Sequence, residues 1–515
     1  IVVAMASFQL SDSDVSIESP SVNREQAIDI AEDFLVTKNI TLAEGYEGNA
    51  MVVTDYPASD FIWEELGSDT FNNLLGSYVL APRWKVRFAK FDGEVETRAR
   101  EVIVSVDFKG NPIRFYNKFP ENEVGASLSQ SDAKVIADQA LSEHFNLSTS
   151  MVSLVSAVES QKPERLDWIF TYAEDREIDY EGSQFQSIIT VSGDQLAGFS
   201  QFVYIPEEWE RMKRDREGFS GILAMLFTIP GGLFIGGLLL IRSFKMLMDR
   251  KVNLRKGALF GGILLISGIV NFFNDSSFLM TLPTDQPIAN LMSITYISTI
   301  AGILIIGLAQ ALFFGSLGTM LKSTINRSSL SDSITGGLVA ALLVATSAML
   351  IGTFQLDLNP NFPRITLGGS YYPILDTFNI YGGFISVAFS LFFAKTLFEW
   401  TDGYSNNIKS NVYGILLVMF VYGGEIGMQY NIGLSLVLIT LYSIVLFMIY
   451  KFIIKNNYML IPFMVLFARV INIFAGNELG AFNSYPNETI LLGVSYAIGL
   501  VVWTQLTKFF FDTDQ

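Results

Sequence analysis

The residues with the clearest chemical potential lie in the apolar C-terminal half of the chain. Glu425 and Arg469 fall well inside long apolar stretches there, and Gln429 and Asn472 follow each of them closely. A charge inside a bilayer is costly and usually marks a paired or functional site. The sequence therefore predicts an intramembrane polar cluster of Glu425, Gln429, Arg469 and Asn472. Such a cluster could bind a ligand or a water molecule, but we favour a structural ion pair or an interfacial Glu near a helix end.

Other reactive residue types are almost absent. The chain has no Cys, which excludes disulfides and thiolate metal sites, and its single His is His144. His144 ends a predicted helix, where we expect it to face solvent or cap the helix. We therefore predict no catalytic residue, no metal site and no cofactor.

The charge is divided unevenly along the chain. Residues 1–218 carry 19 Lys and Arg against 38 Asp and Glu, a net charge of −19, while residues 219–515 carry a net charge of +2. An acidic surface argues against a nucleic-acid partner. The remainder is rich in Phe, Leu, Ile and Gly and is typical of membrane proteins.

Apolar stretches of membrane-spanning length follow the acidic region. A spanning helix needs roughly 20 mostly apolar residues. Nine windows meet or approach this length, and we predict about nine membrane helices: 219–242, 257–273, 291–320, 334–354, 375–399, 411–427, 432–454, 459–475 and 488–511.

Basic residues in the connections predict the orientation, because they accumulate on the cytoplasmic side. Six of them lie from the end of the first window to the start of the second, and the next connection, 274–290, has none. We therefore expect residues 1–218 outside the cytoplasm and the C-terminus inside. The six are Arg242, Lys245, Arg250, Lys251, Arg255 and Lys256.

The acidic region contains the same pattern twice. A helix after a Ser, at 21–35 and again at 129–141, is followed by Trp84–Phe88 and Trp168–Tyr172, and then by alternating strands with Gly turns. Each copy predicts a helix packed on a small antiparallel sheet. The paired strands are 101–106 with 113–115 and 187–191 with 196–199.

These patterns predict a membrane all-α bundle preceded by two α+β extracytoplasmic domains. We expect residues 1–18 to be the end of a truncated signal or membrane helix. The domains are then 19–122, 123–212 and, for the polytopic membrane part, 213–515.

The repeated layout resembles the PepSY-like modules of bacterial envelope proteins. The segment Gly198-Phe199-Ser200-Gln201-Phe202-Val203-Tyr204-Ile205-Pro206-Glu207-Glu208-Trp209-Glu210-Arg211 is similar to the junction before the first membrane helix in large members of the CPBP (Abi, glutamic-type intramembrane protease) family. The resemblance implies a multi-pass protein of the bacterial inner membrane. Active members carry Glu-Glu-x-x-x-Arg on a membrane helix and a His on each of two others.

None of these catalytic elements can be placed in this chain. No adjacent Glu-Glu follows residue 208, and no His follows His144. We therefore favour a degenerate relative: a non-catalytic scaffold or accessory subunit that binds a protein or peptide through its acidic domains. Two alternatives stay open. They are an active protease with an atypical site around Glu425, and a transporter, against which the absence of a membrane repeat argues.

Overall fold

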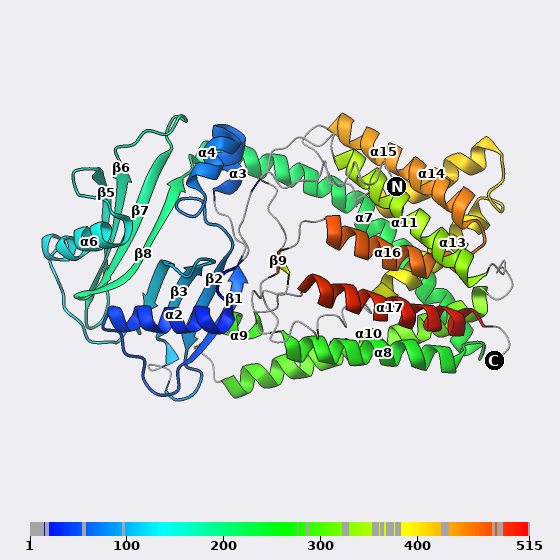
Figure 1. Cartoon of the computed structure of the whole chain (residues 1–515), viewed down its shortest axis with the longest axis horizontal. Coiled ribbons are helices and arrows are strands. Elements are labelled where there is room, and N and C mark those ends of the chain that lie inside the picture. The colour runs from blue at the N-terminus through cyan, green and yellow to red at the C-terminus, as the bar shows by residue number, and fades with distance from the viewer. Residues whose placement is uncertain are drawn as a thin grey trace.

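The protein is described from a computed structural model, in which a sheet region lies at one end of a long helical region (Figure 1). The structure describes residues 15, 20–53, 58–94, 98–275, 277–284, 288–321, 329–352, 360, 365–366, 375, 383–423, 432–475, 479–480 and 488–512. All structural statements below concern these residues.

The first half of the sheet region is a helix on four strands, as predicted. Helix α2 (Arg24–Thr37) begins after Asn23, whose side chain and backbone exchange hydrogen bonds with those of Gln26. This capping box satisfies two N–H groups that the helix leaves open. The predicted cap, Ser21, instead donates to the Phe108 carbonyl, so the cap prediction was wrong by two residues. The other elements are β1 (Glu47–Val53), α3 (Ser59–Phe61), the π-helical η1 (Ile62–Leu66), α4 (Gly67–Leu74), β2 (Arg83–Ala89), β3 (Glu101–Asp107) and β4 (Pro112–Lys118).

The second half repeats this plan. Helix α6 (Gln130–Phe145) begins after Ser129, as predicted, and is followed by β5 (Val152–Gln161), β6 (Leu166–Glu174), β7 (Gln184–Ser192) and β8 (Gln195–Tyr204). In both halves a tryptophan indole donates to the carbonyl just before the helix cap. Trp84 donates to Val22 and Trp168 to Leu128, each at 3.0 Å. The prediction from sequence missed the outer strands β1 and β5.

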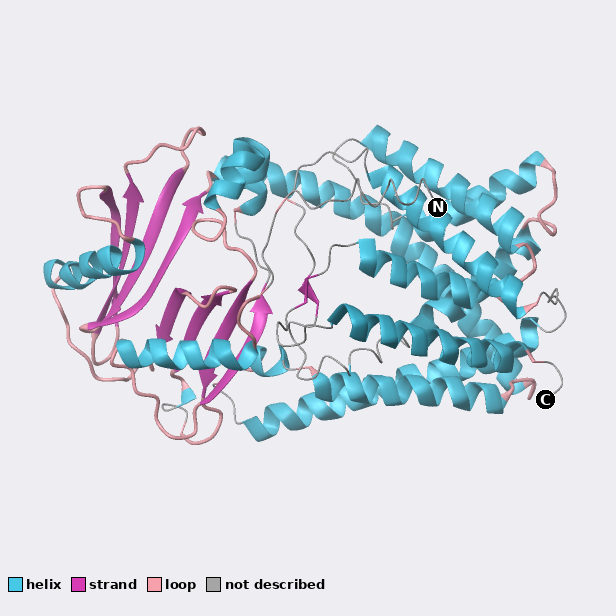
Figure 2. Ribbon diagram, in the orientation of Figure 1, coloured by secondary structure: helices cyan, strands magenta, loops and turns pink. Residues whose placement is uncertain are grey.

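The two halves form one sheet rather than two separate ones. Its strand order is β1-β2-β3-β4-β8-β7-β6-β5, and all described pairings within it are antiparallel. The halves meet where Phe115 pairs with Phe199 and Tyr116 with Gly198. Helices α2 and α6 cover the same face and share one hydrophobic core across this joint. Figure 2 shows the two groups of strands splayed apart on either side of it.

The C-terminal part is a bundle of apolar helices. A helix occupies each of the nine predicted windows, and six of the helices are long and apolar enough to cross a membrane. Several apolar helices indicate a multi-pass membrane protein, while a count of nine spans stays a prediction. The helices are α7 (Glu207–Met248), α8 (Leu254–Asn274), α10 (Ile288–Leu321), α11 (Leu330–Gly352), α13 (Gly383–Trp400), α14 (Ile408–Tyr422), α15 with η4 (Ile432–Met448, Ile449–Ile454), α16 (Leu460–Ala475) and α17 (Glu488–Phe511).

Small residues let the helices approach closely. Gly257 and Gly261, one turn apart on α8, face Ala311 and Gly307 of α10, and a Cβ at Gly257 would lie 2.4 Å from the Ala311 carbonyl oxygen. Gly231 of α7 likewise meets the α14 backbone. Such spacing is typical of helix packing in lipid, where backbone contact replaces burial from water as the driving force.

Candidate functional site

The predicted intramembrane cluster is only partly visible. Arg469 and Asn472 both belong to α16. Glu425 and Gln429 lie outside the described residues. The cluster stays a prediction. Among the described residues, no group of His, Asp and Glu could hold a metal ion.

Other charges in the helical part have partners within the chain. Lys395 is 9% exposed and lies 2.6 Å from Glu399, which also meets Arg242 at 3.2 Å. Lys256 is 6% exposed and donates to the carbonyls of Phe510 and Asp512. A cation is favourable at a helix C-terminus, so Lys256 fixes the end of α17 to the start of α8.

A groove of about 610 Å³ opens on the sheet face that α2 and α6 leave uncovered. Along β2 the side chains of Trp84 and Val86 enter the core, so Lys85 points to the opposite face. The groove crosses the joint between the halves, and both halves line it. The lining residues that matter here are Arg83, Lys85, Arg114, Tyr116, Gly198 and Ser200.

The joint shapes this groove. Strands β4 and β8 pair at only two positions, and the halves diverge beyond them (Figure 2). A Cβ at Gly198 would lie 3.1 Å from the Phe115 carbonyl oxygen and 3.4 Å from the Tyr116 ring. Glycine is therefore what lets β4 and the Tyr116 ring lie against β8 here. Arg114 reaches across the joint and donates to the Gln201 carbonyl at 3.4 Å.

Three basic residues line the groove within an acidic region. Arg83, Lys85 and Arg114 line it, and no Asp or Glu is among its described lining residues. Concave surfaces with one sign of charge concentrate the electrostatic field and attract ligands of the opposite sign. Arg83 is 3% exposed, so its charge acts from the floor of the groove.

The same face of β2 also contacts the helical region. Arg87 donates to Glu101 of β3 at 2.9 Å and to the Leu279 carbonyl of α9 (Ser277–Thr281) at 2.9 Å. The Thr284 hydroxyl donates to Glu101 at 3.0 Å, and Arg98 donates to the Thr284 carbonyl. Buried charge-assisted hydrogen bonds are strong and directional. They dock the connection between α8 and α10 onto the sheet, beside the groove.

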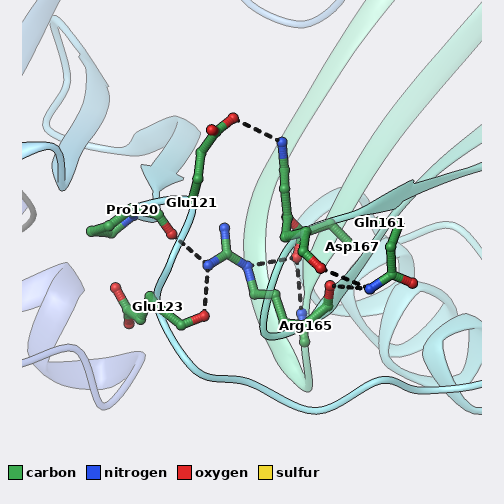
Figure 3. Close-up of polar contacts among 8 residues, drawn as sticks. Pro120, Glu121, Glu123, Gln161, Arg165 and Asp167 are labelled. Atoms are coloured by element: carbon green, nitrogen blue, oxygen red, sulfur yellow. Dashed lines mark hydrogen bonds and ion pairs between the residues drawn. The ribbon is translucent and has the colours of Figure 1, made fainter.

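A second buried ion pair is a structural clamp (Figure 3). Arg165 lies 2.9 Å from Asp167 and donates to the carbonyls of Pro120 and Glu123 in the segment that joins the halves. Asp167 also accepts from the Gly193 backbone N–H. Because these bonds hold the linker and a turn, we assign this cluster to folding rather than to ligand binding.

We predicted that His144 would face solvent or cap its helix. Instead of facing solvent, it lies at the joint, on the helix-covered face. Its ring stacks on Phe199 with the centroids 3.9 Å apart and also meets Phe34 of α2. Burial and the neighbouring Lys38 ammonium lower the pKa of His144 to about 4, and Glu143 opposes this only in part. A neutral imidazole packed on aromatic rings serves as core.

The sequence held a signal for the groove that the prediction missed. In Arg83-Trp84-Lys85-Val86-Arg87, a basic residue alternates with an apolar one over a strand. Alternation with period two places all three bases on one face, and three bases on one face are unusual in a region of net charge −19.

Comparisons with known proteins identify no relative: no family model, no curated protein and no solved structure matches this chain. The site therefore has to be interpreted from its own geometry.

Proposed function

We propose that this is a non-catalytic multi-pass membrane protein, a scaffold or accessory subunit that binds a negatively charged, extended segment of a partner protein in the groove. The observation that carries the proposal is the groove itself, lined by Arg83, Lys85 and Arg114 with no described acidic residue. A concave surface lined by several cations attracts an anionic ligand.

The surrounding charge restricts which anionic partner fits. A long acidic surface would be repelled by a region of net charge −19, whereas a short segment that enters the groove meets the cations first. Like-charge repulsion outside a site and attraction inside it together give specificity. The proposed ligand is therefore a short stretch with one or two Asp or Glu side chains, or a chain-terminal carboxylate.

The shape favours an extended ligand. A volume of about 610 Å³ lies in the range of ordinary ligand pockets and accepts a few residues rather than a folded domain. The ring of Tyr116, 47% exposed, offers an apolar contact beside Arg114. Aromatic and guanidinium groups side by side are typical of the residues that dominate binding energy at interfaces.

The test measures binding of short acidic peptides to the full-length protein in detergent micelles. We expect Lys85→Glu to weaken the acidic peptide at least about tenfold, because it replaces an attraction with a repulsion inside the groove. Lys134→Glu, on helix α6 and remote from the groove lining, is the matched control and should change binding little. Equal weakening by both variants, or none by either, would reject the groove as the site.

We also propose that the protein lies in the bacterial inner membrane, with its sheet region outside the cytoplasm. Helix α7 runs from the sheet to the far end of the bundle (Figure 1), so the connection with Arg250 and Lys251 lies at the opposite end from the sheet. This supports the positive-inside orientation. Because the chain has no Cys, single cysteines report sidedness directly. An impermeant maleimide should label Glu121→Cys in intact spheroplasts and Lys251→Cys only after lysis; the reverse pattern would invert the proposal.

The proposed lack of proteolytic activity rests on the resemblance to the CPBP junction over 198–211 and on the missing Glu-Glu and His motifs. It is tested by incubating the purified protein with peptide substrates, with and without divalent metal. We expect no cleavage by either the native protein or Glu425→Gln. Cleavage that Glu425→Gln abolishes would instead establish the atypical protease.

A further inference from the structure

Strand β5 is the outermost strand of the sheet on the side away from α9. It pairs with β6 on one side, and no described strand pairs with its other side. An edge strand presents a row of backbone N–H and C=O groups that can pair with another chain, and proteins usually block such edges with Lys, Pro or a covering segment.

The two edge strands of this sheet, β1 and β5, differ in their charged residues and in their contacts with the helical region. Strand β1, the counterpart of β5 in the first half, begins with Glu47 and is contacted by α9 from the helical region. Strand β5 has no Lys, Arg or Pro over its whole length, and Glu159 is its only charged residue. This edge therefore carries a single charge, and no described strand or helix covers it.

The regular part of β5 is its second half. The register shifts between Leu154 and Ser156, and from Ser156 to Gln161 the pairing with β6 is continuous. A bulge near Val155 interrupts the edge before that point. The edge available for pairing is therefore the six-residue segment 156–161.

The side chains of this segment indicate which residues a strand paired with it would carry. On the helix-free face Val158, 55% exposed, lies opposite Ile169, 38% exposed. On the other face Ala157 packs toward the core, and Glu159 lies opposite Trp168. A strand added beside β5 would place one side chain next to Val158 and another next to Glu159.

We propose that β5 is a docking edge for an extended segment of a partner protein, which adds a ninth strand to the sheet. That segment carries an apolar residue that packs beside Val158 and a Lys or Arg opposite Glu159. Addition of a strand to an exposed edge is a general mode of peptide recognition, in which the backbone gives affinity and alternate side chains give specificity.

A second copy of this chain is the less favourable occupant. Self-pairing would bring together two regions that each carry a net charge of −19, and would offer Glu159 no cation from the partner's β5, which has none. Charge complementarity therefore selects a different protein with a basic residue in its strand.

The experiment measures binding of two eight-residue peptides to the full-length protein in nanodiscs. Both alternate Val with Thr, and one carries a central Lys where the other carries Glu. We expect the Lys peptide to bind the native protein more tightly and Glu159→Lys to reverse this preference, with about a fivefold to tenfold change for each peptide. Hydrogen exchange should slow at the amides of 156–161 when the Lys peptide is bound.

Val158→Lys places a blocking charge on the exposed edge and should abolish binding of the Lys peptide. Val135→Lys, at a Val that is 66% exposed on α6, is its control and should leave binding unchanged. Three results would overturn the proposal: no change with Val158→Lys, the same peptide preference in Glu159→Lys as in the native protein, or a dimer that Val158→Lys converts to monomer. Because neither Val158 nor Glu159 lines the groove, failure here would leave the proposed groove ligand untouched.

Discussion

The two halves of the sheet region share one arrangement of helix and strands, here called the frame. They differ in the side chains on the helix-free face. Each has a capped helix, a tryptophan whose indole donates to the carbonyl just before that cap, and a bulge at the same place, at Ser105/Val106 and at Thr190/Val191. Aligned by their tryptophans, Phe115 corresponds to Phe199, and these two residues pair at the joint. The frame is therefore close to twofold symmetric, with Phe115 and Phe199 at its centre.

The charges break this symmetry. Arg83, Lys85 and Arg114 of the first half correspond to Asp167, Ile169 and Gly198 of the second, as the strand registers show. One wall of the groove therefore carries all its described cations. A repeat supplies two copies of the same scaffold. Side chains on the face that does not form the core can then diverge, so that only one copy supplies the basic residues of the site.

Docking to the helical region shows the same divergence. Arg87 and Glu101, which hold α9, correspond to Thr171 and Gln186 in the second half. Only the first half has the charges to dock α9, and the corresponding outer edge of the second half, β5, stays open.

The largest expected effect tests whether the halves are one folding unit. Trp84→Ala or Trp168→Ala should each destabilise the sheet region by about 3–5 kcal/mol, because a large buried side chain and a hydrogen bond are lost. Since the halves share one core, either variant should accelerate amide hydrogen exchange in both β2–β3 and β6–β7. Acceleration confined to the altered half would mean that the halves unfold independently.

The next effect compares the docking pair with its counterpart. Glu101→Ala should cost about 3 kcal/mol, because Arg87, whose side chain is 6% exposed, loses its carboxylate. Gln186→Ala removes a neutral side chain at the equivalent position and should cost about 1 kcal/mol. Limited proteolysis should cut near residues 278–284 faster in Glu101→Ala than in Gln186→Ala. Equal cutting would show that the charges do not dock α9.

Much of this frame could be predicted from the sequence, because local patterns determine it. Helical spacing, period-two alternation and Gly turns give the helices and inner strands of each half. The edge strand β5 was missed because its exposed sequence, Val-Ser-Leu-Val-Ser-Ala-Val-Glu-Ser-Gln, has no regular apolar alternation. The union of the halves could not be predicted, since it rests on pairing between Phe115 and Phe199, far apart in the chain.

The candidate site was harder to predict than the frame. Its cations are spread over Arg83, Lys85 and Arg114, and only the fold brings them to one groove. The Glu-Glu-x-x-x-Arg motif that the resemblance implies is contiguous, and its absence is visible in the sequence alone. A binding groove across two repeats leaves no such contiguous signature.

The smallest effect concerns the helices that cover the joint, and it depends on pH. His144 lies fifteen residues after the cap of α6, the position that Lys38 occupies after the cap of α2. Burial and the Lys38 ammonium hold the pKa of His144 at about 4, against 6.5 for an ordinary His. Between pH 6.5 and about pH 4, His144 is therefore protonated in the unfolded chain but neutral in the folded chain.

Stability should consequently fall as the pH falls from 6.5 to 4. After allowance for partial solvent exposure, we expect a loss of about 1–2 kcal/mol. His144→Phe keeps the stacking on Phe199 and Phe34 but cannot titrate, so it should remove this part of the pH dependence. Unfolding midpoints in denaturant, measured at pH 7 and pH 4.5 for both proteins, check this. If His144→Phe loses as much stability as the native protein over this range, carboxyl groups rather than the joint control the acid response.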